Sequence, residues 1–244
     1  MDIRGFVARL FSNTPGYSET ASGQIRVGKN GDVSVLSRQL GLQNAADEGA
    51  YWVGTNPTIG TGIAGITTLT AWVTTTPHMI LQNNDVVGGK NIIFDYIKVQ
   101  QSAGQLPTSA TDWRYAFFTD TIKRFSSGGT AVTPVNANTG ATASTIAQLY
   151  WAATAAAASA QRQIKAGVVR SVIPVVLDQY EWAVGNGAGS HSSTAQNGTT
   201  PNLITIPIPP VVVAPQTSLL FYMWGTAHGA VQATHEFTVG WIER

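Results

Sequence analysis

The sequence predicts a mainly β protein: an antiparallel, jelly-roll-like β-sandwich with an extended N-terminal arm and at most one short helix. Short runs with period-two alternation of apolar and polar residues recur from residue 51 onward, and clusters of Gly, Pro, Asn and Ser separate them. Only 11% of the residues are charged, so uncharged polar side chains or neighbouring subunits must cover the exterior. We therefore divide the chain into an arm, residues 1–50, and a sandwich domain, residues 51–244.

The strongest strand signals lie near the C-terminus. Ser218–Trp224 is apolar on both faces, whereas residues 233–242 alternate, with Phe237 and Trp241 on the apolar face. The stretch 225–230 between them has the small-residue composition of a hairpin loop. The sequence therefore predicts that these two runs pair antiparallel.

A strand that is apolar on both faces needs packing partners on both sides. One face of Ser218–Trp224 meets the sandwich core, and the other requires a neighbouring element or subunit. We therefore expect at least one of Tyr222 and Trp224 to lie at or beside a subunit contact. Phe237 and Trp241 are expected to point into the core.

Other strands follow from the same alternation. The proline-rich stretch 207–215 is expected at a sheet edge or on a crossing segment, because proline cannot donate to a ladder. In the strand predicted over 91–100, Asp95 shares a face with Ile93, Ile97 and Val99. The remaining strands are predicted at 67–74, 78–81, 113–119, 167–176 and 179–184.

Helix competes with strand only in Ser144–Gln163. Ser144 is a fair N-cap, and the alanines of 155–158 are the best helix formers in the chain. The same residues also fit two short strands around a small-residue loop. We favour at least one helical turn here.

The titratable residues form no recognisable catalytic or metal-binding pattern. His235 and Glu236 are adjacent but point to opposite faces of a strand, so they cannot ligate one metal from the same side. Asp95 and Asp178 are expected to be partly buried, each as the partner of an arginine or a backbone N–H group. We expect no catalytic residue, no cofactor and no metal site. The four histidines are His78, His191, His228 and His235.

The long polar stretch 185–201 is predicted to be an exposed loop. Its glycine-rich beginning, 185–191, superficially resembles a phosphate-binding loop, but more polar loop follows where a helix would be needed. Long exposed loops often carry function, so this one is a candidate site for binding a receptor or glycan.

Charge and hydropathy narrow the class of partner. The net charge of +1 produces no field that would attract a polynucleotide, so we expect no direct nucleic-acid partner. No run of about 18 apolar residues occurs, so no membrane partner is expected. The chain has no cysteine, which excludes disulfides and thiolate metal sites.

Several stretches of the sandwich domain carry a further pattern: 124–136 (RFSSGGTAVTPVN), 173–175 with 178–180, and 209–215 leading to 224–225 and 239–243. Together they resemble tailed-bacteriophage virion proteins of the head decoration or cement type, over about residues 50–244. The resemblance implies a jelly-roll-like sandwich on the capsid exterior, made in the host cytoplasm and bound to the major capsid protein of the same virion. From lattice symmetry we expect a homotrimer, and no catalytic residue carries over.

Two other functions fit the same residues. One is a jelly-roll major capsid protein, which would form particles when expressed alone. The other is a receptor-binding or carbohydrate-binding virion module, in which aromatic side chains stack on sugars. The candidates for such stacking are Trp52, Trp72, Trp113 and Tyr115.

Overall fold

The computed structural model describes residues 41–64, 71–103, 113–170, 178–184, 203–225 and 234–244. Residues 1–40 of the expected arm and the predicted loop 185–201 lie outside these ranges, and Leu42–Arg244 form one compact unit. The elements are α2 (Gly41–Asp47), β1 (Tyr51–Thr55), β2 (Ile63–Ala64), β3 (Met79–Asn83), β4 (Ile92–Ala103), β5 (Trp113–Asp120), β6 (Phe125–Ser127), β7 (Thr130–Val132), β8 (Val135–Asn136), β9 (Ala147–Trp151), β10 (Thr154–Ala155), β11 (Arg162–Arg170), β12 (Gln179–Val184), β13 (Leu203–Ile208), β14 (Val211–Val213), β15 (Ser218–Gly225) and β16 (Thr234–Glu243).

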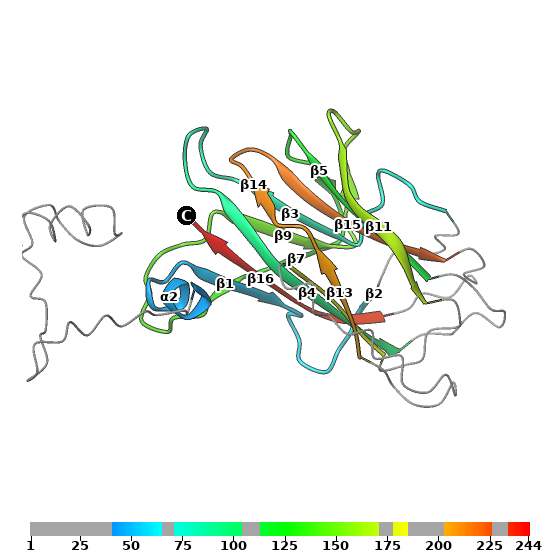
Figure 1. Cartoon of the computed structure of the whole chain (residues 1–244), viewed down its shortest axis with the longest axis horizontal. Coiled ribbons are helices and arrows are strands. Elements are labelled where there is room, and N and C mark those ends of the chain that lie inside the picture. Colours follow the sequence, from blue (N-terminus) through cyan, green and yellow to red (C-terminus); the bar gives the residue numbers. More distant parts are fainter. Residues whose placement is uncertain (1–40, 65–70, 104–112, 171–177, 185–202, 226–233) are drawn as a thin grey trace, which may run out of the picture. The chain divides into compact units, whose positions relative to one another are not determined.

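The strands form two large sheets, which confirms the predicted mainly β, antiparallel sandwich. One sheet has eight strands in the order β13-β12-β4-β16-β1-β8, with β14 paired to β4 and β2 paired to β16. The other has six, in the order β11-β5-β15-β3-β9-β7, and β6 and β10 form a separate pair (Figure 1). Among the described strands only β12 and β13 run parallel.

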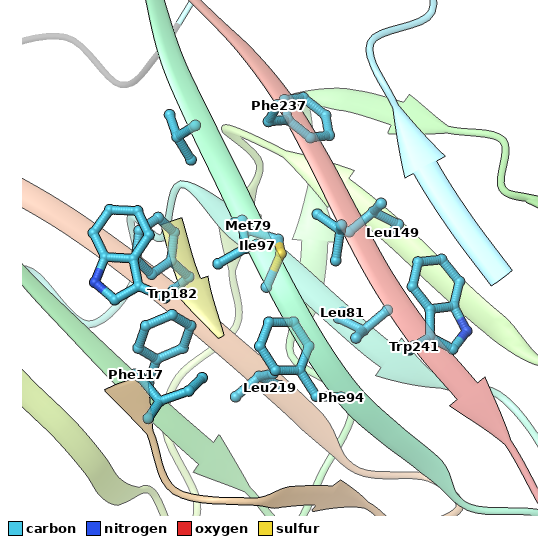
Figure 2. Packing of buried hydrophobic residues seen from close by; sticks show 14 of the residues in the cluster. Met79, Leu81, Phe94, Ile97, Phe117, Leu149, Trp182, Leu219, Phe237 and Trp241 are labelled. Carbon is cyan, nitrogen blue, oxygen red and sulfur yellow. The ribbon is translucent and has the colours of Figure 1, made fainter. Parts of the chain in front are cut away.

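The core lies between the two sheets. Figure 2 shows Phe117 and Leu219 from the six-stranded sheet facing the same apolar interior as Trp182 and Phe94 from the other. The rings of Trp151 in β9 and Phe237 in β16 stack at a centroid distance of 4.2 Å and join the sheets. Phe237 and Trp241 are 3% and 0% exposed, which confirms that both point into the core.

The predicted C-terminal hairpin is wrong. Strand β15 pairs with β3 and β5 in the six-stranded sheet, whereas β16 pairs with β1, β2 and β4 in the eight-stranded sheet. The apolar patterns of the two stretches explain why they do not pair with each other. Hairpin strands share the same two faces of one sheet, but Ser218–Trp224 is apolar on both faces and residues 233–242 on one. These two environments belong to different sheets.

The predicted face of β4 is also wrong in part. Phe94 pairs opposite Trp241 and Tyr96 opposite Gly240, so Asp95 is an extra residue that forms a β-bulge. The bulge reverses the alternation. Ile97 is buried in the core as predicted, whereas Ile93 and Asp95 are only half-buried.

The helical turn favoured in Ser144–Gln163 does not form. Strand β9 is hydrogen-bonded between β3 and β7, and the short strand β10 pairs with β6. Ala153 and Ala155 are buried against a sheet, where small side chains let the backbone approach closely. Tertiary pairing thus outweighs alanine's helix propensity. The described helix is α2 instead.

The remaining strand predictions have mixed outcomes. Residues 71–74 do not form a strand, so that part of the predicted strand 67–74 is wrong, and residues 65–70 lie outside the described ranges. The proline-rich stretch lies where expected. Strand β13, which contains Pro207, is an edge of the eight-stranded sheet, and Pro209–Pro210 leads from it to β14 on β4.

Candidate functional site

The outer face of the six-stranded sheet carries a second apolar cluster. Alternation in β15 places Phe221 and Met223 in the main core, and Leu220 and Tyr222 in this outer cluster. Two segments of the same chain, residues 71–76 and 152–161, cover part of the face. Ala155 N–H donates to the Thr75 carbonyl at 2.9 Å and links the two covering segments.

A buried arginine holds this cover in place. Arg124 is 0% exposed, and its guanidinium donates to a carboxylate oxygen of Asp120 at 2.7 Å. It also donates to the carbonyls of Thr74 at 3.0 Å and Ala156 at 2.8 Å, and to Gln161 Oε1 at 3.3 Å. One side chain therefore connects the sheet to both covering segments. A planar guanidinium with five donors suits such a junction.

Asp120 completes the junction. Burial would raise the pKa of this carboxyl, but the backbone N–H groups of Ser159 and Ala160, together with Arg124, outweigh burial and hold it below its usual range. Those two N–H groups donate to Asp120 at 3.1 and 3.0 Å. The carboxylate is therefore ionised at neutral pH, and it fixes residues 159–160 against the sheet.

Tyr222, one of the two predicted interface residues, is covered by the chain itself. It is 1% exposed, and its hydroxyl donates to the Thr74 carbonyl at 2.8 Å. Burial raises its pKa to about 12, although Arg124 partly opposes that rise. Trp224 is only half-buried, so the expected subunit contact, which stays a prediction, now depends on Trp224.

The buried Tyr222 hydroxyl predicts a specific alkaline instability. Because its folded pKa of about 12 exceeds the unfolded value of 10.0, its contribution to stability is full below pH 10 and is lost as pH rises towards 12. We expect ionisation of the Tyr222 hydroxyl to lower the free energy of unfolding by about 2 to 3 kcal/mol as pH rises from 10 to 12 and beyond. Urea unfolding of wild type and Tyr222→Phe at pH 8 to 11.5 measures it. Equal pH dependence of the two proteins would contradict the prediction.

Near β11 the outer face exposes large apolar side chains. Trp72 stacks on Phe118 at a ring-centroid distance of 5.1 Å and is still 39% exposed. The register places Trp224, Arg114 and Val168 in one cross-strand row, and Val168 is 49% exposed. We call Trp72, Trp224 and Val168 the Trp72 patch. Arg114 lies between half-buried Trp224 and exposed Val168, so the patch combines apolar side chains with a cation. Aromatic side chains and arginine are both enriched at protein-binding surfaces.

Two histidines that are distant in the sequence meet in the core. The rings of His78 and His235 lie 6.0 Å apart, and each is 6.1 Å from the Trp151 ring. Met223 N–H donates to His78 Nδ1 at 3.1 Å, so that nitrogen is unprotonated. No local pattern in the sequence predicts this pair, because His78 precedes β3 of one sheet, His235 lies in β16 of the other, and the two meet only where the sheets pack face to face. His191 and His228 lie outside the described residues.

The two carboxylates singled out from the sequence have tyrosine partners. Asp178 is fully buried and accepts from the Tyr180 hydroxyl at 3.1 Å, and half-buried Asp95 accepts from the Tyr51 hydroxyl at 2.6 Å. Burial and Asp95 raise the pKa of Tyr51 well above its usual range. Within the described parts of the chain, no group of three or more His, Asp or Glu side chains could hold a metal ion.

The four aromatic residues considered for sugar stacking differ in how far their side chains are exposed to solvent. Trp52, Trp113 and Tyr115 belong to the main core and are 5% exposed or less. Trp72 alone of these four presents a ring edge or face to solvent. A carbohydrate site built from this set would therefore depend on Trp72.

Comparison with family models, curated proteins and solved structures found no match to this chain. Across the described ranges, no helix has the length and apolar character needed to cross a membrane.

Proposed function

We propose that this chain is a structural component of a bacteriophage virion, a capsid decoration or cement protein that binds the major capsid protein on the head exterior. The observation that carries the proposal is the Trp72 patch, which exposes aromatic and aliphatic side chains in a protein with only 11% charged residues. Interface cores are depleted in charge and enriched in aromatic residues, with tryptophan prominent among the residues that dominate binding energy.

The support beneath the patch is closely packed and hydrogen-bonded, which suits a binding surface. Phe118 and Tyr222 form the floor under Trp72, and Arg124 hydrogen-bonds the Thr74 carbonyl two residues further along. Side chains held this way lose little conformational entropy when a partner binds. We propose that the protein acts without turnover. A saturable activity abolished by Asp178→Asn would refute that part.

Trp224→Ala is expected to weaken contacts between chains more than it weakens folding. Its ring is half-buried at the patch, so truncation removes contact area at the surface while the core stays filled. We expect at least about a tenfold loss of affinity for the partner subunit, about 1.4 kcal/mol, with a smaller change in unfolding free energy. Binding is measured with purified heads that lack the protein. Unchanged binding alongside strongly impaired folding would place Trp224 in the core instead.

The proposed function is tested by purifying virions of the phage that encodes the chain. The protein should be present at a fixed ratio to the major capsid protein and should be released before the shell disassembles. Its absence from virions would refute the proposal. Closed particles formed by this chain alone would identify it as a shell protein.

The exposed Trp72 ring also favours one alternative, a carbohydrate-binding virion module. In that case the isolated protein would bind glycans, and Trp72→Ala would abolish binding without unfolding the chain. A decoration protein would bind heads and show no glycan affinity. The two measurements separate the functions.

A further inference from the structure

The net charge of +1 averages two parts of the chain that carry opposite charge. Residues 113–177 contain one acid, Asp120, and six cations: Arg114, Lys123, Arg124, Arg162, Lys165 and Arg170. Residues 42–112 and 178–244, the remainder of the compact unit, contain nine acids and only three cations. The middle of this unit is therefore basic, and the stretches before and after it are acidic.

Folding gathers the basic part on the side of the six-stranded sheet. Residues 113–177 supply four strands of that sheet, β5, β7, β9 and β11, and the covering segment 152–161. The sheet's other two strands, β3 and β15, and the covering segment 71–76 contain no charged residue. Asp120 is buried and paired with Arg124. In the described strands and covering segments of this side, every charge that reaches solvent is therefore a cation.

The outer face of the eight-stranded sheet carries mainly acids. Glu181 and Glu236 alternate with side chains of the main core, Asp95 lies at the bulge in β4, and all three are half-buried. Burial raises the pKa of Tyr96, and the nearby charges of Asp95 and Glu181 raise it further, so both carboxylates lie close to that ring. Lys98 is the cation of the described strands of this sheet. The two sides of the sandwich thus differ in the sign of their charge.

The Trp72 patch lies on the basic side. Arg114 is part of its cross-strand row, and Lys165 and Arg162 lie on the same edge strand, β11, as Val168. Lys165 is three residues from Val168 along the strand, roughly 10 Å. Charges act over about 8 Å at physiological ionic strength, so a partner that covers the patch and the sheet edge comes within range of these cations. Cations on an edge strand also hinder edge-to-edge pairing, but charges of either sign serve that purpose.

We propose that the six-stranded sheet is the side that binds the partner, that the partner surface is acidic, and that the acidic face of the eight-stranded sheet points away from it. This inference rests on the proposed function and adds to it the orientation of the molecule and the chemistry of its partner. Complementary charge raises the rate of association and disfavours the reversed orientation, in which acids would face acids. The exposed aliphatic side chain of Val168 favours an acidic protein over a polynucleotide, which binds chiefly through phosphate contacts with cations.

The test is binding of the full chain to purified heads that lack it, measured from about 50 to about 500 mM salt. Wild-type affinity should fall at least about tenfold over that range, because salt screens the contacts between opposite charges. The double variant Arg162→Gln, Lys165→Gln should bind about three- to tenfold more weakly at low salt and should depend less on salt. Arg162 is exposed and Lys165 is half-buried at the sheet edge, so the variant should keep the wild-type melting temperature.

The matched control, Lys90→Gln with Lys98→Gln, makes the same change in net charge outside the six-stranded sheet. It should bind heads as wild type does. The inference is overturned if wild-type binding does not respond to salt, if the Arg162, Lys165 variant binds as tightly as wild type, or if the control loses as much affinity as that variant. It is also overturned if a DNA duplex binds wild type as tightly as heads do.

In all of these cases heads still bind the protein, so the proposed function stands. Wild type that binds no heads would instead refute the proposed function, and the orientation with it.

Discussion

Replacing Arg124 with methionine is expected to lower the free energy of unfolding by about 3 to 5 kcal/mol. Methionine fills much of the same space but donates no hydrogen bond. The variant leaves the Asp120 carboxylate buried without its cation. It also removes the donor to the Ala156 carbonyl and leaves the Thr74 carbonyl with the Tyr222 hydroxyl alone of its two donors described above. Urea unfolding at pH 7 measures the change, and Arg124→Lys, which keeps the charge but not the planar fork, should be intermediate.

The pH dependence of this variant provides a second readout. Because the pKa of Asp120 is lowered in the folded protein, its contribution to stability is full above the unfolded value of 3.8 and is lost as pH falls below it. Arg124→Met removes one cause of that lowering. The stability difference between wild type and variant should therefore shrink below pH 4. The prediction would be contradicted if the stability difference between wild type and Arg124→Met did not change with pH, or if it were below about 1 kcal/mol at pH 7. Arg124 would then not be what holds residues 71–76 and 152–161 against the sheet.

Alternation in the sequence predicted the strands that have one polar face. Residues 234–242 and 179–184 lie in strands, and the core positions Phe237, Trp241 and Trp182 follow the period-two pattern. Such patterns are local, because each side chain's direction depends only on its place in its own strand. The class of fold could therefore be predicted without knowing which strands pair.

Strand pairing depends on residues that are distant in the sequence, so local patterns could not predict it. Strand β15 is apolar on both faces because residues 71–76 and 152–161 cover its outer side, a contact that no local pattern encodes. The same contact explains why the alanines of 155–158 do not form a helix. Arg124 and Asp120 offer a usable signal, because they are opposite charges four residues apart in a charge-poor chain.

The candidate surfaces were predicted only in part. Trp224 was identified from its place in an apolar run, whereas the burial of Tyr222 depends on the Thr74 carbonyl, which is remote in sequence. Neighbouring side chains on the outer face of the eight-stranded sheet come from seven different strands, so they can be identified only from the register. Bulges such as that at Asp95 add to the difficulty, because one extra residue reverses the faces of a strand.

Trp241→Ala is expected to lower the free energy of unfolding by about 3 to 5 kcal/mol, because it opens a large cavity in the core. Trp241 is fully buried, and its ring packs over Gly54, where an added Cβ would lie 3.5 Å from Trp241 Cζ3. Its Nε1 donates to Glu243 Oε1 at 3.0 Å, and Glu243 also accepts from Thr145.

Two further variants separate the cavity from the hydrogen bond. Trp241→Phe keeps a ring in the core but removes the donor to Glu243, so it should lose less stability than Trp241→Ala. Trp224→Ala, the matched deletion at a half-buried site, should lose the least and should weaken partner binding instead. Thermal and urea unfolding rank the three proteins. If Trp224→Ala destabilises the fold as much as Trp241→Ala does, the six-stranded sheet depends on Trp224 for its own packing, and the Trp72 patch loses its central residue as a binding surface.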